Sequence, residues 1–384
     1  MLIISKSSVK MGSYSKQLGK FSWPLLLKNY SKMNSIYDYS KIFSGGLFPF
    51  SRSIKTYIKN GIVNVDKPIN LNPHQLVMWI KKFLNVSKIG QIFTLDTNVS
   101  GCLIIFIENS IHLLKSHLQK GKTFVGILKF SHLNLALKKK FCKEIKNFRG
   151  LFFQSLFHIS NVKRQLKIRC IYSSLIIEFD EKRKTCILEI QCEFNAYISY
   201  LSTYLSVNFK NKCKLLELRQ IKSGYLSEND NIVTLHDLLD SGWLYICKKN
   251  EFYIRKTIMP LEVLLTSYKR IVVKNSAVNS ICYGAKLTFS GVVRIEQNLG
   301  KEDEIILMTI KGEAIATAIS KINIITLYQQ TQGVICIIKD IIMKRDVYPK
   351  KWGIGICSVK KHLTISSGFL FIKEKATKLK YWNF

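Results

Sequence analysis

Hydrophobic and polar positions alternate in blocks along the first two thirds of the chain, and each block predicts a strand or a helix. The segment Gly61 to Pro68 has the short apolar pattern of a strand that runs into a turn. Asn72 followed by Pro73 then supplies an N-cap and a first-turn residue for a helix. Apolar side chains recur on one face of this helix, with Lys81 and Lys82 opposite. The predicted apolar face consists of Leu76, Trp79, Ile80, Phe83 and Leu84.

The following blocks predict further strands and helices. Continuous apolar runs indicate buried strands, and a charged turn at 180–184 between two β-rich runs indicates a hairpin. The predicted strands cover 101–107, 125–130, 168–179 and 186–193, and the predicted helices cover 110–119 and 196–209. Strands mixed with helices in this way predict an α/β (α+β) unit with a mixed sheet and flanking helices.

The pattern changes after Pro260 and Leu264. Between Arg270 and Lys344 the apolar runs are short and are broken by glycines at spacings typical of a small β-barrel. We therefore expect a basic N-terminal tail (1–20), an aromatic-rich N-terminal segment (21–60), a first domain (61–262), a small β domain (268–345) and a C-terminal tail (346–384).

The composition is that of a folded protein. Hydrophobic residues make up 47% of the 384 positions and there are 6 prolines, which excludes wholesale disorder. The most apolar run ends at Glu108, well short of the ~20 residues of a membrane helix. The N-terminal apolar patch is too short for a signal peptide. We expect a soluble protein with no membrane partner.

Charge adds a candidate partner. The chain has 59 Lys and Arg against 25 Asp and Glu, a net charge of +34. Such an excess favours a polyanionic partner, because counterions are released when Lys and Arg reach phosphates. Nucleic acid is the preferred partner, and an anionic membrane surface is an alternative. An AT-biased genome is another explanation of the many lysines, although that bias does not explain why acidic residues are not equally frequent. The basic stretch 132–150 fits a solvated helix face and an RNA-facing surface equally.

The 10 cysteines are scattered and include no C-x-x-C pair. Most lie in apolar runs, where Cys serves as a small core residue. This pattern indicates a reducing compartment, with neither a disulfide framework nor a zinc site. We expect no metal and no small-molecule cofactor.

One carboxylate lies at a conspicuous place between apolar segments. Asp96 stands in a short polar turn just before the apolar run 101–107. An Asp in such a place is most often a turn former, because its side chain accepts hydrogen bonds from nearby backbone N–H groups. Considered alone, Asp96 indicates no chemistry.

Six blocks in a fixed order around Asp96 resemble the motifs of the TruB-type pseudouridine synthases. They are GIVNVDKP (61–68), TLD with VSG (94–101), GKTFVG (121–126), VKRQLKIR (162–169), CEFNAYI (192–198) and LRQIKSG (218–224). Two more blocks narrow the resemblance to the eukaryotic and archaeal branch, the dyskerin family: WPLLLKNY (23–30) and MKRDVYPKKWG (343–353). An ordered set of blocks is far more specific than any single one.

The resemblance implies a mixed-sheet pseudouridine synthase catalytic domain followed by a PUA domain, an RNA-binding barrel to which 284–318 is similar. It implies the catalytic subunit of a box H/ACA small nucleolar ribonucleoprotein. Such a subunit converts uridine to pseudouridine in rRNA, and in snRNA as a further substrate, and supports rRNA processing and ribosome biogenesis. The implied partners are box H/ACA guide RNA, the rRNA substrate and three small core proteins. The implied location is the nucleus and nucleolus. The composition, rich in Lys, Ile and Asn, also fits a protein encoded in a nucleomorph.

Isomerising uridine breaks the glycosidic C–N bond, turns the base and rejoins it through carbon, after the nucleotide has left its stack. Such a site needs a carboxylate, an aromatic platform and basic surroundings. The resemblance makes Asp96 the catalytic carboxylate and Tyr197 a residue that handles a proton or holds the acid. It implies substrate contacts for Phe124, Gln91, Leu218, Arg219, Ser199 and Lys67, and RNA contacts for Lys163, Arg164 and Lys222.

Several matched positions depart from the family pattern. Phe124 stands where the family has Tyr, so it can stack on a base but has no hydroxyl. Gln91 replaces a His that helps base extrusion, and Phe93 and Thr97 replace a Gly and a Pro that shape the loop. Ser199 replaces an Arg that would pair with the carboxylate, which removes a charge-assisted hydrogen bond.

These matches and departures leave three functions to compare. An active synthase explains why Asp96 is retained, whereas a scaffold that binds and stabilises guide RNA but turns over slowly explains Ser199. A generic basic RNA-binding protein explains neither Asp96 nor Tyr197 in register with the motifs. We prefer the enzyme and keep the scaffold as the alternative.

The net charge generates a first prediction, on salt dependence. Affinity for a box H/ACA guide RNA should fall steeply, by at least about tenfold, between 50 and 200 mM salt, since phosphate contacts release counterions. Filter binding across that range measures the slope. A flat response would remove the inference from net charge.

Overall fold

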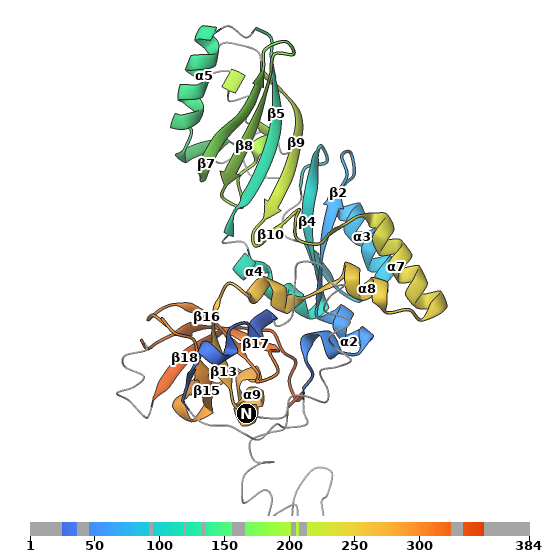
Figure 1. Cartoon of the computed structure of the whole chain (residues 1–384), viewed down its shortest axis with the longest axis vertical. Helices are drawn as coiled ribbons and strands as arrows, with labels where there is room; N and C mark the ends of the chain where they lie inside the picture. The colour runs from blue at the N-terminus through green and yellow to red at the C-terminus, as the bar shows by residue number, and fades with distance from the viewer. Residues whose placement is uncertain are drawn as a thin grey trace, which may run out of the picture. The chain divides into compact units, whose positions relative to one another are not determined.

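The computed structural model describes residues 25–36, 46–91, 95–117, 120–132, 135–155, 166–200, 205–206, 213–323 and 333–348. The chain forms two compact units (Figure 1). Within the described residues, the first unit comprises Ser53–Leu264, and the second combines residues 25–52 with residues 265–348.

A mixed sheet forms the first unit. Its strands are β2 (Gly61–Lys67), β3 (Ile89–Gln91), β4 (Val99–Ile107), β5 (Lys122–Phe130), β6 (Gly150–Ser155), β7 (Leu166–Asp180), β8 (Thr185–Cys192), β9 (Cys213–Ser223), β10 (Leu226–Ser227), β11 (Ile232–Val233) and β12 (Met259–Pro260). The main order is β11-β2-β4-β9-β5-β8-β7-β6, with β3 on β4, β10 on β9 and β12 on β2. The β4–β9 and β2–β11 pairs are parallel and the other pairs of this sheet are antiparallel.

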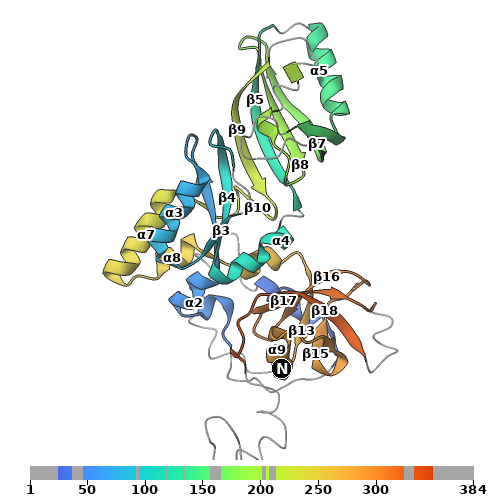
Figure 2. The same ribbon diagram turned by 180° about the vertical axis from the view of Figure 1, so that it is seen from behind.

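Short and long helices flank this sheet. They are α2 (Ile54–Lys59), α3 (Pro73–Leu84), α4 (Leu114–His117), α5 (Leu135–Asn147), α7 (Leu235–Lys248) and α8 (Phe252–Thr257), with 3₁₀ turns η4 (Glu108–Leu113), η6 (Ile198–Tyr200) and η7 (Leu261–Leu265). Figures 1 and 2 show α3 and α7 side by side next to β2 and β4, and α5 beside β7. The predicted strands and the hairpin are present, each within a few residues of its expected bounds.

Helix α3 begins where the sequence predicts. The Asn72 side chain accepts a hydrogen bond from the His74 N–H at 2.9 Å, and the helix ends at Asn85 in the left-handed region with φ 48°. Its buried residues are Pro73, Leu76, Ile80 and Leu84. Trp79, which we expected on the same face, is 45% exposed, so the buried stripe is narrower than predicted.

The basic stretch after β5 folds as α5. The buried Phe141 ring meets the rings of Phe130 and Phe179 edge-on, with centroids 5.0 and 5.9 Å apart. Lys139 and Lys140 lie on the exposed side of the helix. The stretch therefore has a solvated face, and contact of that face with RNA stays a prediction.

The helix predicted over 196–209 is wrong at its start. Tyr197 is not helical, and the 3₁₀ turn η6 begins only at Ile198. Residues 205–206 are helical, and 201–204 and 207–209 lie outside the described residues. The Gln154 amide donates to the Tyr197 C=O at 2.7 Å and accepts from its N–H at 3.2 Å. Because this side chain satisfies both groups of the Tyr197 backbone, the segment needs no helix there.

A second sheet forms the other unit. Its strands are β1 (Asn34–Ser35), β13 (Lys269–Val273), β14 (Leu287–Thr288), β15 (Val292–Ile295), β16 (Glu304–Met308), β17 (Ala314–Ser320) and β18 (Val334–Ile341), in the order β1-β15-β13-β16-β17-β18-β14. Helix α9 (Asn275–Cys282) and the 3₁₀ turns η1 (Leu25–Leu27), η2 (Tyr30–Lys32), η3 (Pro49–Ser51) and η8 (Phe289–Gly291) complete it. Its core includes Ile271, Val278, Val292, Leu307 and Ile335.

Arg270 fastens the N-terminal segment to this unit. It is 1% exposed, and its guanidinium donates to the C=O groups of Leu26 and Lys28 at 2.5 and 2.6 Å. Two further donors reach the Glu296 carboxylate, each at 2.9 Å. A buried guanidinium needs an acceptor for most of its N–H donors. The contact between β13 and the N-terminal segment therefore depends on this one side chain.

This arrangement predicts that Arg270→Met lowers the free energy of unfolding by about 3 kcal/mol, because Glu296 and two carbonyls lose their donor. Hydrogen exchange across residues 25–36 should accelerate. Lys269→Met is the matched control, since it removes a half-exposed cation paired with Asp303 and should cost less than about 1 kcal/mol. Equal losses in the two variants would contradict this role of Arg270.

Candidate active site

Asp96 opens the turn that leads into β4. Its C=O accepts a hydrogen bond from the Val99 N–H at 3.1 Å. The C=O of the next residue, Thr97, accepts from the Asn70 N–H at 2.9 Å and from the Lys67 ammonium at 3.0 Å. The turn is therefore tied to the loop that follows β2.

A close approach of two strands places this turn against β9. Gly101 has φ 104°, and a Cβ there would lie 2.3 Å from the C=O oxygen of Gln220. Only glycine accommodates both the backbone conformation and the contact. In the resulting parallel register Val99 pairs with Leu218, so the wall of β9 stands beside the turn that carries Asp96.

The turn that carries Asp96 lines a pocket. Five residues expected from the sequence line it: Asp96, Phe124, Tyr197, Ser199 and Leu218. The other lining residues are Leu95, Val99, Lys122, Phe194, Asn195, Ala196 and Ile198. The motifs that are far apart in the sequence thus meet around one carboxylate.

Ser199 contacts the carboxylate directly. Its hydroxyl donates a short hydrogen bond to Asp96 Oδ2. The position at which the resemblance implies an Arg therefore still provides a donor to Asp96, but a neutral one. A neutral donor orients the carboxylate without compensating its charge.

The charge of Asp96 acts on two buried ammonium groups. Lys67 donates to the C=O groups of Pro68 and Thr97 at 2.9 and 3.0 Å. Desolvation lowers its pKa to about 8, and the charge of Asp96 opposes the shift. Desolvation likewise lowers the pKa of Lys122 to about 8, against the opposing influence of Cys192 and Asp96. Both lysines are thus cations held in a poorly solvated environment.

Aromatic and amide groups complete the pocket. Phe124 is buried in β5, and Tyr197 is held by its backbone bonds to Gln154. The Asn195 side-chain oxygen is buried and has no hydrogen-bond partner among the residues that the structure describes. A pocket with an aromatic wall and an unused acceptor suits a planar base that carries N–H donors.

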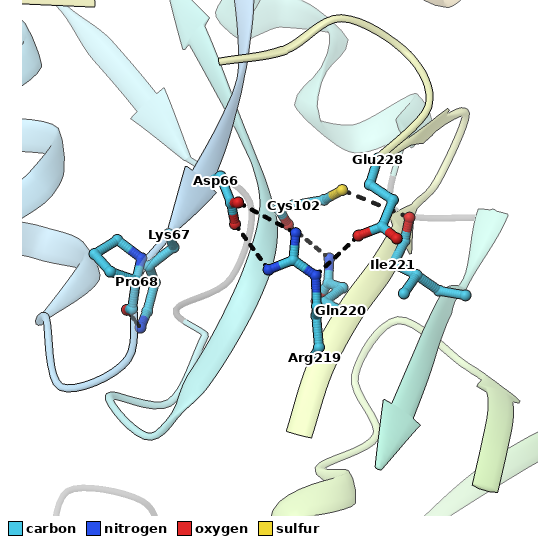
Figure 3. Close-up of polar contacts among 8 residues, drawn as sticks. All are labelled: Asp66, Lys67, Pro68, Cys102, Arg219, Gln220, Ile221 and Glu228. Carbon is cyan, nitrogen blue, oxygen red and sulfur yellow. Dashed lines mark hydrogen bonds and ion pairs between the residues drawn. The ribbon is translucent and has the colours of Figure 1, made fainter. Parts of the chain in front are cut away.

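Arg219 does not join this pocket. It follows Leu218 in β9, and consecutive strand residues face opposite sides of a sheet. Figure 3 shows its guanidinium directed at two carboxylates. It donates to both oxygens of Asp66 at 3.1 and 3.2 Å and to Glu228 at 2.9 Å. These bonds clamp β2 to β9, and a substrate contact of Arg219 stays a prediction.

The other residues predicted from the sequence do not line this pocket or lie outside the described residues. The Gln91 amide lies 3.4 Å from the His74 ring at the end of β3, and Gln91 does not line the pocket. Lys67 also stays out of the lining, and Figure 3 shows its side chain beside Pro68, whose C=O it binds. Lys222 is exposed on β9. Lys163, Arg164 and Phe93 lie outside the described residues.

Sequence reasoning missed Lys122 and Asn195. Both lie in blocks that carry the resemblance, GKTFVG and CEFNAYI, so a signal for them existed. A Lys or Asn in a motif is nevertheless assigned to solvent by default, because such side chains are rarely buried.

The described part of the chain contains no group of three or more His, Cys, Asp and Glu side chains placed to hold a metal ion. Nor is any helix among the described residues both long and apolar enough to cross a bilayer.

The buried lysines generate a prediction on stability. The pKa of Lys122 lies at about 8 in the folded chain and at 10.5 ordinarily, so between these values the unfolded chain binds more protons. Burying the protonated Lys122 side chain therefore lowers the free energy of unfolding. This cost is complete below pH 8 and disappears as the pH rises to 10.5. Lys122→Met should raise the free energy of unfolding by up to about 3 kcal/mol at pH 7, with a gain that vanishes near pH 10.5. Urea unfolding at both pH values measures this, and a pH-independent difference would contradict it.

Comparisons with known proteins agree with the motifs. Family models match a DKCLD (NUC011) domain over residues 20–77 and a PUA domain over residues 269–341. The H/ACA ribonucleoprotein complex subunit CBF5 of Kluyveromyces lactis is 42% identical over 362 residues, covering 94% of this chain and 76% of the relative. The subunit DKC1 of Homo sapiens is 41% identical over 369 residues, covering 96% of this chain and 72% of the relative.

Solved structures share the fold. An H/ACA RNP bound to a substrate RNA containing 2'-deoxyuridine matches with a TM-score of 0.73 and 27% identity, covering 83% of this chain and 97% of that one. A Cbf5-Nop10-Gar1 complex matches with a TM-score of 0.72 and 28% identity, covering 83% and 95%. The expected α/β catalytic unit followed by a small β-barrel PUA domain is thereby confirmed. The chain belongs to the CBF5/DKC1 family of H/ACA ribonucleoprotein complex subunits, the dyskerin family.

Proposed function

We propose that this chain is the RNA-guided pseudouridine synthase of a box H/ACA ribonucleoprotein and isomerises uridine in rRNA, with snRNA as a further substrate. The observation that carries the proposal is the pocket that Asp96, bound by the Ser199 hydroxyl, lines together with the aromatic residue Phe124. Family membership supplies the substrate class, because the relatives are H/ACA ribonucleoprotein subunits.

The reaction rearranges one nucleotide without net oxidation or reduction. The N1–C1′ bond of uridine breaks, the base turns, a C5–C1′ bond forms, and a proton leaves C5 while another is taken up at N1. Asp96 acts on the flipped nucleotide, and the aromatic ring of Phe124 supports its base by stacking. Tyr197 lines the same pocket and either handles a proton or holds the acid.

Recognition of uracil has support in the pocket. The N3–H group of uracil is a donor, and the buried Asn195 oxygen lacks one. A hydrogen bond from the base to this buried acceptor removes the cost of leaving it unpaired, and this favours binding of the substrate. Leu218 and Phe124 supply the apolar walls that exclude water from the base.

Partners and location follow the family. The matched complexes contain Nop10, Gar1 and substrate RNA. For this chain we infer box H/ACA guide RNA, an rRNA substrate and three small core proteins as partners. We infer a nuclear, and specifically nucleolar, location, with a nucleomorph as the alternative. The domain bounds 61–262 and 268–345, with the segment 21–60 and the tails 1–20 and 346–384, stay predictions.

A catalytically weakened scaffold is the second candidate function. It is favoured by Ser199, which gives Asp96 a neutral partner where the family pattern has an arginine. A scaffold would retain guide RNA as tightly as the enzyme, so only turnover separates the two.

Asp96→Asn tests the enzyme. In a particle reconstituted with guide RNA, the variant should convert uridine with a single-turnover rate constant at least about a thousandfold below that of wild type. The reason is that the amide neither attacks nor accepts a proton as the carboxylate does. Guide RNA affinity should not change. Asp180→Asn makes the same substitution in the exposed β7–β8 turn and should convert uridine at the wild-type rate.

Two outcomes would decide against the enzyme. Equal conversion by wild type and Asp96→Asn would remove Asp96 from the chemistry. Wild-type particles that hold guide RNA tightly but convert no uridine would establish the scaffold.

A further inference from the structure

The carboxylate of Asp96 has a neutral hydrogen-bond donor and lies in a pocket with several apolar side chains. It is half-buried in a pocket with the apolar side chains of Leu95, Val99 and Leu218. Its hydrogen-bond donor there is the neutral Ser199 hydroxyl. An ionised carboxylate beside so much apolar surface is stabilised mainly by nearby positive charge.

Two lysines are close enough to act on Asp96, and they differ in position. The Lys67 ammonium is bound to the carbonyls of Pro68 and Thr97 and stays out of the pocket lining. Lys122 lines the pocket, at the first position of β5. It is 7% exposed, and its Nζ lies 4.4 Å from the centroid of the Phe194 ring, another lining residue.

Lys122 and Asp96 line the same pocket, and among the residues of that lining Asp96 is the one with a carboxylate. Cys192 and Asp96 are the groups that favour its protonated form. Burial raises the pKa of the Cys192 thiol to about 12, so this group is neutral at physiological pH. The Asp96 carboxylate is then the negative charge that stabilises the buried ammonium, and by reciprocity the ammonium stabilises the carboxylate.

We propose that Lys122 is a positioning residue for the reaction: its buried ammonium is the counter-charge that, together with the Ser199 hydroxyl, orients the Asp96 carboxylate in the pocket. The Phe194 ring stabilises the ammonium by a cation–π contact. This role rests on the proposed function, since it acts through the carboxylate of that reaction.

Kinetics provide the first test. Lys122→Met should lower the single-turnover rate about ten- to hundredfold, the loss of one charge-assisted contact in a buried site, with guide and substrate RNA affinities within about twofold of wild type. Lys129→Met is the matched control, because it removes an exposed cation from the same strand and should keep the wild-type rate. Lys122→Arg keeps the charge and should recover most of the rate.

Stability separates this role from simple packing. A rate loss in Lys122→Met with unfolding free energy at or above that of wild type supports the proposal. A rate loss with a matching loss of stability, a wild-type rate, or an equal rate loss in Lys129→Met overturns it.

A titration tests the pairing even if no uridine is converted. NMR of 13Cε-labelled lysine, with Lys122 assigned through Lys122→Arg, follows its ammonium in the intact chain. Asp96→Asn should lower the pKa of Lys122 further below about 8, by roughly one unit, because a cause that raises it is removed. An unchanged midpoint overturns the proposal, whereas a shifted midpoint with inactive wild type overturns only the proposed function.

Discussion

The close contact between β4 and β9 at Gly101 is the constraint on which the site depends. Without a Cβ at this position the two backbones approach until the Gln220 carbonyl occupies the space of a side chain. The contact brings Leu218 beside Val99 and therefore beside the turn of Asp96. It also brings Arg219 of β9 within reach of Asp66 on β2, on the other side of β4, so β9 provides both a wall of the pocket and the clamp to β2.

Charge in this unit is arranged in two ways that differ in burial. Arg219 pairs with Asp66 and Glu228 in a partly solvated network, where geometry is good and desolvation is modest. Lys67 and Lys122 are buried near Asp96, and burial lowers the pKa of each toward 8. The first arrangement stabilises the sheet, whereas the second costs stability and places positive charge at the carboxylate, as functional sites commonly do.

The second unit shows the same dependence on a few long-range polar contacts. Arg270 joins β13 to carbonyls of the N-terminal segment, which lies more than 240 positions earlier in the chain. β1 adds backbone pairing to β15. Local propensity could not produce these contacts, because the segment is short and its 3₁₀ turns bury few side chains.

The sequence by itself predicted several strands of the first unit, the helix α3, the small β domain and five residues of the pocket, because strand and helix periods are local and ordered motifs indicate which segments must meet. It identified Asp96, Phe124 and Leu218, which the structure brings together. Only tertiary structure decided that Ser199 donates to Asp96, that Arg219 faces away and that Lys122 is buried. Each of these depends on what a distant segment places against the side chain, whether the residue lies in the turn η6, as Ser199 does, or on a strand, as Lys122 and Arg219 do. Spacing along a strand gives the alternation of its two faces, but not the partners that each face meets.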